Sequence, residues 1–183
     1  MSILQTERLA LCKLDLSDAG FILELLNEGA FIRFIGDKGV RTLADARDYL
    51  LKGPIASYEK WGFGLYLTCV RGDSPERCGT PIGICGLVKR DTLPDVDVGF
   101  AFLERYRSNG YAVESASAVL HYAGQVLRLN RIVAIVAPDN AGSIAVLERV
   151  GLKFERMITL GEGGRELKLF GPAHPENSPG DAA

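Results

Sequence analysis

The sequence has few of the residues that build metal sites, disulfide frameworks or membrane spans. It holds only two histidines and four cysteines in 183 residues, and no two cysteines form a C-x-x-C pair. We therefore expect no metal site, because structural zinc needs closely spaced Cys and His ligands. No apolar run approaches membrane-spanning length, and no basic segment followed by an apolar one marks a secretory leader. These absences predict a protein without membrane contact, located in the cytoplasm.

Charge excess and phosphate-binding fingerprints are missing as well. The formal net charge is −2, which gives no basic surface for nucleic acid. Neither G-x-G-x-x-G nor G-x-x-x-x-G-K-[ST] occurs, so a dinucleotide-binding or P-loop fold is not expected. The 47% apolar and 24% charged content is that of an ordinary globular chain. We predict a single domain over residues 1–171 and a disordered tail over 172–183, which has almost no apolar residues.

The four cysteines fall into two groups. Cys12, Cys69 and Cys85 stand in apolar, strand-like stretches, whereas Cys78 lies in a polar loop. We interpret the first three as buried reduced thiols and the fourth as an exposed one. A catalytic cysteine is the alternative, although no histidine lies near any of them in the sequence.

The hydrophobic pattern predicts strands alternating with helices. Ser17 and Thr42 are candidate N-caps of two early helices, and Gly151 is placed to end the last helix. Strands are expected over 8–14, 65–70, 81–88, 96–103 and 131–137, and a closing hairpin over 152–160 and 165–170.

The stretch over residues 97–127 joins an apolar strand to an amphipathic helix through a short turn. A helix N-terminus leaves backbone N–H groups without partners and favours negative charge. Gly110 permits close approach to the backbone, and Arg107 adds a guanidinium suited to phosphate. The junction is therefore interpreted either as a pyrophosphate cradle or as a tight, well-packed connection.

Three segments carry a resemblance to a known family. The pattern R-x-x-G-x-A at 107–112 resembles the acyl-CoA signature of the GNAT superfamily of N-acetyltransferases. Residues 138–152 resemble that family's N-x-x-S…E-[KR]-x-G-[FL] segment, and residues 6–11 resemble the start of its ribosomal-protein-alanine acetyltransferase (RimJ/RimL-like) branch. The resemblance covers about residues 5 to 170. It implies an α+β acetyltransferase fold with a mixed, mostly antiparallel sheet flanked by helices.

The resemblance also implies where acetyl-CoA, the co-substrate, is held. Backbone groups of the apolar strand would pair with the pantetheine arm, the following turn would hold the pyrophosphate, and the last helix would contact the arm. The residues so implied are Phe100, Ala101, Phe102, Arg107, Ser108, Asn109, Gly110, Tyr111, Ala112 and Asn140. A backbone N–H of the strand would polarise the thioester carbonyl. Asn140 is equally well explained as a helix cap.

The catalytic residues are less clearly indicated. Many members of the family have a tyrosine that protonates the leaving thiolate, but Leu147 stands at that position here. Ser143 resembles the serine given this role in the ribosomal-protein branch, and it can also be a first-turn residue bonded to the backbone. Glu162 is the candidate general base, with an exposed turn residue as its alternative interpretation. Asp97, Glu7 and a water relayed to a carbonyl are weaker candidates.

By this resemblance the chain transfers acetyl from acetyl-CoA to a primary amine, either a protein N-terminus or a small amine, as a monomer or homodimer. Residues 28–40 and 55–63 would select the acceptor, although Trp61 and Phe63 also suit core packing. The alternative is a non-catalytic acyl-CoA-binding module, because the tyrosine is missing and no base is obvious.

Overall fold

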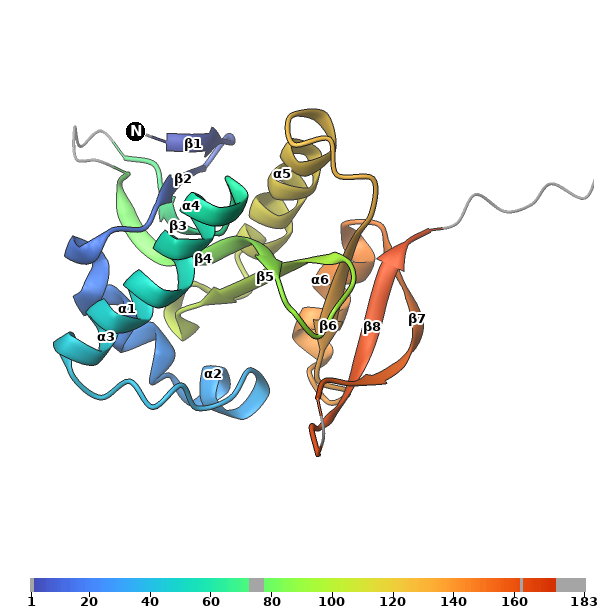
Figure 1. Cartoon of the computed structure of the whole chain (residues 1–183). Coiled ribbons are helices and arrows are strands. Elements are labelled where there is room, and N and C mark those ends of the chain that lie inside the picture. Colours follow the sequence, from blue (N-terminus) through green and yellow to red (C-terminus); the bar gives the residue numbers. More distant parts are fainter. Residues whose placement is uncertain (1, 73–77, 162, 174–183) are drawn as a thin grey trace, which may run out of the picture.

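The computed structural model describes residues 2–72, 78–161 and 163–173. Its strands form one sheet in the order β1-β2-β3-β4-β5-β6-β8-β7, antiparallel except between β5 and β6 (Figure 1). The strands are β1 Ser2–Gln5, β2 Leu9–Lys13, β3 Leu65–Val70, β4 Thr80–Lys89, β5 Val96–Phe102, β6 Ile132–Val136, β7 Leu152–Thr159 and β8 Glu166–Pro172. This confirms the expected α+β class with a mixed, mostly antiparallel sheet.

Helices cover both faces of the sheet. The α-helices are α1 Ala19–Leu26, α2 Gly29–Phe34, α3 Leu43–Leu50, α4 Ala56–Trp61, α5 Tyr111–Gln125 and α6 Ala141–Arg149. A π-helical turn, Leu51–Ile55, carries Pro54 and joins α3 to α4. Figure 1 shows α1 to α4 grouped on one side of the molecule, away from α5 and α6. The flanking helices expected from the sequence are thus confirmed.

Each face of the sheet has its own core. Ala116, Val119 and Ala123 of α5 are fully buried against one face, at the helical spacing predicted from the sequence. Ile22 of α1 and Leu50 of α3 are equally buried in the second core, against the other face. The sheet therefore presents β5 between two packed layers of helices.

The first strand and the first helix differ from expectation. The chain begins with an additional strand, β1, that pairs antiparallel with β2. Ser17 is not the N-cap that was predicted. Asp15 accepts the Ser17 N–H and caps a 3-10 turn, Leu16–Asp18, from which α1 continues. Ser17 therefore donates its own N–H to a carboxylate two residues earlier and lies inside the capped turn. Thr42 does cap α3, in a capping box with Asp45.

The cysteines give two corrections. Cys69 and Cys85 are buried and outside any disulfide, as predicted, and burial raises the pKa of Cys85 to about 12. Cys12 is fully buried but forms a disulfide with Cys78, so its prediction as a reduced thiol is wrong. The prediction of Cys78 as an exposed thiol is also wrong, because this residue is half-buried and disulfide-bonded. The two residues are 66 positions apart in the chain and meet only because β2 and the segment leading into β4 both flank β3.

The ends of the described chain bear on two further expectations. Strand β8 runs through Pro172, the first residue of the predicted tail over 172–183, and residues 174–183 lie outside the described part. Across the described ranges, none of the helices has the length and apolar character needed to cross a bilayer.

Candidate active site

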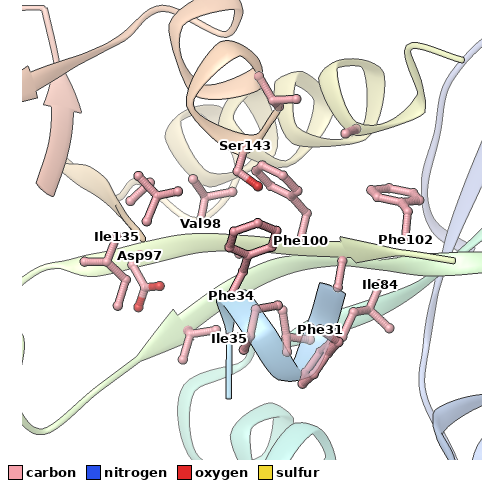
Figure 2. Close-up of a pocket in the computed structure, with 18 of the residues that line it drawn as sticks. Phe31, Phe34, Ile35, Ile84, Asp97, Val98, Phe100, Phe102, Ile135 and Ser143 are labelled. Atoms are coloured by element: carbon pink, nitrogen blue, oxygen red, sulfur yellow. The ribbon is translucent and has the colours of Figure 1, made fainter. Parts of the chain in front are cut away.

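One cavity of about 910 Å³ reaches both layers of helices around β5. It is lined by residues of α2, α3 and α4 on one side and of α5 and α6 on the other. Figure 2 shows Asp97 and Phe102 at opposite ends of the labelled residues of β5, with Phe31, Phe34 and Ile35 approaching from α2. The cavity therefore follows the strand that the sequence singled out.

The cavity opens because β5 and β6 separate. They pair only at Val96 with Ile132 and Asp97 with Val133, whereas β4 pairs with β5 along its whole length. The Leu103 N–H donates to Ile82 O at 3.0 Å, and backbone groups alternate between the two edges of a strand. The N–H and C=O groups of Phe100 and Phe102 therefore point toward the opening. The backbone of Ala101, which was also expected to bind the arm, turns toward β4.

The turn after β5 presents backbone N–H groups at the start of α5. Ser108 and Gly110 both have left-handed backbone conformations, with φ of 61° and 80°. The first helical donor with a partner inside α5 is the Glu114 N–H, which bonds Gly110 O at 3.0 Å. The N–H groups of residues 111–113 thus lack helical partners, as at any helix N-terminus. Successive donors in such a turn form a concavity that suits an anion.

Arg107 is engaged in holding this turn. Its Nε donates to Phe102 O at 3.0 Å and its Nη2 pairs with Glu28 at 2.8 Å. Its own N–H donates to Glu104 O. Asn109 donates from its side chain to Arg107 O at 2.9 Å. Both side chains therefore shape the loop, and their role in binding phosphate stays a prediction.

The N-terminal segment reinforces the turn from the other side. Arg8 pairs with Glu114 at 2.6 Å and donates to Asn109 O at 3.0 Å. Thr6 donates to the same carboxylate. Partial burial raises the pKa of Glu114, but the hydrogen bonds from Thr6 and Arg8 outweigh it and hold the pKa below its usual value. We name these three residues, Thr6, Arg8 and Glu114, the N-terminal clamp.

The first turn of α6 brings Ser143 to the cavity. Asn140 caps the helix by accepting the Ser143 N–H at 3.1 Å, which confirms its interpretation as a cap. The Ser143 side chain lines the cavity, and in Figure 2 its hydroxyl points toward β5. Leu147, at the position of the family's tyrosine, is buried and has no proton to give. Ser143 is thus placed for the predicted role, although nothing yet tests it.

Asp97 lies at the far end of β5 from the turn. Its side chain is 2% exposed, and Arg90 donates to its two carboxylate oxygens at 2.9 and 3.3 Å. Burial raises the pKa of Asp97 above its usual value, and Arg90 only partly opposes this. Among the lining residues that the structure describes, Asp97 is the only carboxylate. It was a weaker candidate from the sequence, which gave no sign of its burial.

The remaining candidate residues from the sequence differ in their position relative to the cavity. Glu7 is exposed and absent from the cavity lining. Glu162 lies outside the described residues. Phe63 is buried as predicted, but Trp61 is 41% exposed and lines the cavity, so its assignment to the core is wrong. The left-handed Gly62 ends α4 between them, which turns the two aromatic side chains in different directions.

Two basic residues of the lining were not singled out from the sequence, although one of them, Lys38, lies in the stretch 28–40 that was expected to select the acceptor. Lys38 follows α2 and Arg165 precedes β8, and each stands in a polar stretch typical of a surface loop. Nothing local connects them to each other or to Asp97. Within the described ranges, no group of three or more His, Cys, Asp or Glu side chains is arranged to hold a metal ion.

The family comparison agrees with this geometry. Residues 8–153 match the family described as the acetyltransferase (GNAT) domain, which is most of the chain. This protein therefore belongs to the GNAT family of acetyltransferases. The resemblance drawn from three short segments is confirmed at the level of the family.

Individual relatives support the same conclusion. N-acetyltransferase YnaD of Bacillus subtilis is 27% identical over 150 residues, 82% of each protein. An alignment with YkkB of the same organism is 32% identical but spans only 45% of this chain and 49% of that protein. Among solved structures, an acetyltransferase from Agrobacterium tumefaciens superposes with a TM-score of 0.77 at 24% identity, covering 93% of this chain and 94% of the other. That structural likeness concerns the fold.

Proposed function

We propose that this acetyltransferase moves the acetyl group of acetyl-CoA to a primary amine, a protein N-terminus or a small amine, by direct attack. The observation that carries the proposal is the continuity of the open edge of β5 with the unpaired N–H groups at the start of α5. An extended amide-containing arm and an attached pyrophosphate need donors in this order along one cavity. This order of donors along one cavity supports acetyl-CoA as the co-substrate.

The backbone holds most of the co-substrate in this proposal. The N–H groups from Ser108 to Ala112 bind the pyrophosphate, and the edge of β5 at Phe100 and Phe102 binds the arm. Because Arg107 already donates to Phe102 O, Phe100 is the better placed of the two to accept and donate along the arm. Asn140 stands at the helix cap beside the arm.

In this proposal two side chains transfer protons, one as a base and one as an acid. Acetyl-CoA supplies a thioester whose carbonyl carbon is open to attack by a neutral amine. Asp97 accepts the proton that the amine gives up, directly or through water, because burial has raised its pKa toward the useful range. The amine nitrogen bonds to the acetyl carbon, the carbon–sulfur bond breaks, and Ser143 donates a proton to the departing sulfur. Ser143 then regains a proton from solvent, to which Asp97 releases the proton it took from the amine. Glu162, the candidate base from the sequence, stays a prediction.

The weak base favours one kind of amine. A protein α-amine has a pKa near ~7.7–8.0 and lysine near ~10.4, so lysine costs roughly 3–4 kcal/mol more to deprotonate. Ribosomal-protein acetyltransferases are among the structures with this fold: the RimL L7/L12 α-N-protein acetyltransferase in complex with coenzyme A superposes with a TM-score of 0.77 at 16% identity. The superposed region covers 93% of this chain and 97% of the RimL chain. The RimJ/RimL-like branch therefore stays our proposal for the subfamily.

Location and assembly are also proposals. The chain acts as a monomer or homodimer, with acetyl-CoA and the amine as its partners. The cytoplasmic location stays a prediction, and the disulfide between Cys12 and Cys78 weighs against it because disulfides are rare in reducing compartments.

The test is release of CoA thiol from acetyl-CoA by the purified protein with a panel of α-amines, lysine derivatives and small amines. We expect amine-dependent release and an acetylated product by mass spectrometry. Tight binding of acetyl-CoA without release for any amine would instead favour the non-catalytic binding module.

A variant tests the role of Ser143 in the same assay. Ser143→Ala should lower kcat about tenfold and leave the Kd of acetyl-CoA within about twofold, a modest effect because a thiolate of pKa ~8.5 leaves without full protonation. Ser117→Ala, on the exposed face of α5, is the matched control. Unchanged kcat in Ser143→Ala would remove this residue from the mechanism.

A further inference from the structure

The cavity has a strong charge imbalance for a protein of formal net charge −2. Its described lining holds one carboxylate, that of Asp97, and many basic side chains. The basic residues are Lys38, Lys52, Lys60, Lys89, Arg90, Arg107, Arg149 and Arg165. Since the rest of the molecule carries an excess of acid, this concentration of positive charge is local to the cavity.

Several of these cations are already neutralised by a neighbour. Arg107 pairs with Glu28, Lys52 with Asp48, and Arg90 with Asp97. Arg165 differs, because both terminal nitrogens of its guanidinium donate to a neutral acceptor, Arg33 O, at 3.1 Å. Among the described residues, neither Arg165 nor Lys38 forms an ion pair with a carboxylate.

Lys38, Arg90 and Arg165 lie close enough to act on one another, and we name them the cationic cluster. Partial burial of the Lys38 ammonium lowers its pKa even though much of the residue is exposed, and the like charges of Arg90 and Arg165 lower it further. These cations come from three segments, the loop after α2, the end of β4 and the approach to β8. Only the tertiary fold brings them together.

The cluster is remote from the turn assigned to the pyrophosphate. Arg90 is bound to Asp97, at one end of β5, and the turn follows Phe102 at the other. Five residues of extended strand separate these ends by about 17 Å. The cationic cluster therefore lies at the end of the cavity where the amine acceptor is proposed to bind. This end also holds Asp97, the proposed acceptor of the amine proton.

We propose that the amine acceptor carries an acidic group, a carboxylate or a phosphate, within a few bonds of its amine, and that Lys38 and Arg165 bind this group. The inference rests on the proposed acetyl transfer and narrows its substrate class. Arg165 is fixed by Arg33 O, and the planar guanidinium suits either oxyanion. Arg90 pairs with Asp97 and favours its ionised form, while the acidic group binds the other two cations.

The experiment compares acceptors that differ only in the acidic group. One arm uses the blocked peptides Ala-Asp-Ala amide and Ala-Asn-Ala amide, and the other uses phosphoethanolamine and ethanolamine, so that carboxylate and phosphate sources are separated. We expect kcat/KM to be about tenfold or more higher for the acidic member of at least one pair, as one or two charge-assisted bonds would give. Equal values within both pairs would overturn the inference while leaving acetyl transfer established. No turnover with any member would contradict the proposed function itself.

Variants then assign the preference to residues. Arg165→Gln and Lys38→Gln should each lower kcat/KM for the acidic acceptor about tenfold, mainly through KM, and change the neutral acceptor and the KM of acetyl-CoA less than about twofold. Arg165→Lys should recover part of the loss. Arg156→Gln, which removes an exposed charge outside the lining, is the control. An equal loss for both acceptors, or a raised KM for acetyl-CoA, would show a structural or co-substrate role and overturn the assignment.

Discussion

The two ends of β5 are built in different ways. Beyond Phe102 the cavity ends in a turn whose proposed binding groups are main-chain N–H donors, and whose side chains, such as Arg107, are occupied in shaping the loop. At Asp97 the proposed binding groups are side chains from three separate segments, and burial shifts the pKa of Asp97 upward and that of Lys38 downward. The comparison teaches that a backbone site is encoded locally, whereas a side-chain site depends on the whole fold.

The largest expected effect tests the backbone end. Gly110→Glu should raise the Kd of acetyl-CoA about 100-fold or more, because a side chain is strained at φ of 80° and a carboxylate opposes the phosphates, roughly 2.8 kcal/mol in all. Isothermal titration calorimetry measures this. Gly124→Glu, near the other end of the same helix and in open space, is the matched control. A folded Gly110→Glu protein with unchanged Kd would mean that the turn does not hold the phosphates.

The next effect tests the side-chain end. Asp97→Asn should lower kcat about 100-fold, the lower range for a lost general base, and change the Kd of acetyl-CoA less than about threefold. Because burial raises the pKa of Asp97, the activity that depends on its ionised form rises as the pH increases through that raised value. The variant should lack this rise in the plot of kcat against pH. If Asp97→Asn keeps both the rise and the rate, Asp97 is not the group that accepts the proton of the amine.

The same raised pKa has a consequence for folding. The folded protein holds the Asp97 proton more tightly than the unfolded chain, so this group favours folding most below its ordinary pKa of 3.8 and loses that contribution as the pH rises through the raised value. Asp97→Asn should remove this part of the pH dependence of stability.

The smallest effect contrasts with the first. Ser108→Gly should leave the Kd of acetyl-CoA within about threefold, because the cradle uses the main chain and glycine accepts the left-handed φ of 61°. Relief of that strain, roughly 1–2 kcal/mol, is largely offset by the greater freedom of the unfolded chain. Thermal melting should therefore shift by only a few degrees. A large loss of affinity would assign the Ser108 hydroxyl a direct contact and weaken the contrast between the two ends.

The sequence predicted the parts of the site that are contiguous in the chain. The α5 turn and the Asn140 cap follow from glycine placement, helix spacing and capping chemistry, which act over a few residues. Most strands and the closing hairpin followed from apolar periodicity. The separation of β5 from β6 was not predicted, because pairing partners are set by packing across the whole sheet.

Some of the missed features depend on residues far apart in the sequence, and others on local geometry that the residue types do not reveal. Trp61 was assigned to the core since aromatic residues are usually buried, but the left-handed Gly62 redirects the chain. The disulfide of Cys12 and the convergence of Lys38 with Arg165 need distances that no local pattern contains. Asp97 looked like one polar residue in an apolar strand, and only its burial beside Arg90 makes it a candidate base.

The N-terminal clamp also bears on when the proposed acetyl-CoA site forms during folding. Arg8 and Glu114 are 106 residues apart, yet their contact supports the turn on which the proposed phosphate cradle depends. On a growing chain, the N-terminal strands leave the ribosome long before Glu114 is made, and loop closure over this distance is slow. We therefore expect the proposed acetyl-CoA site to form late in folding. A fragment limited to β5 and α5 carries the signature residues and lacks the support that shapes them.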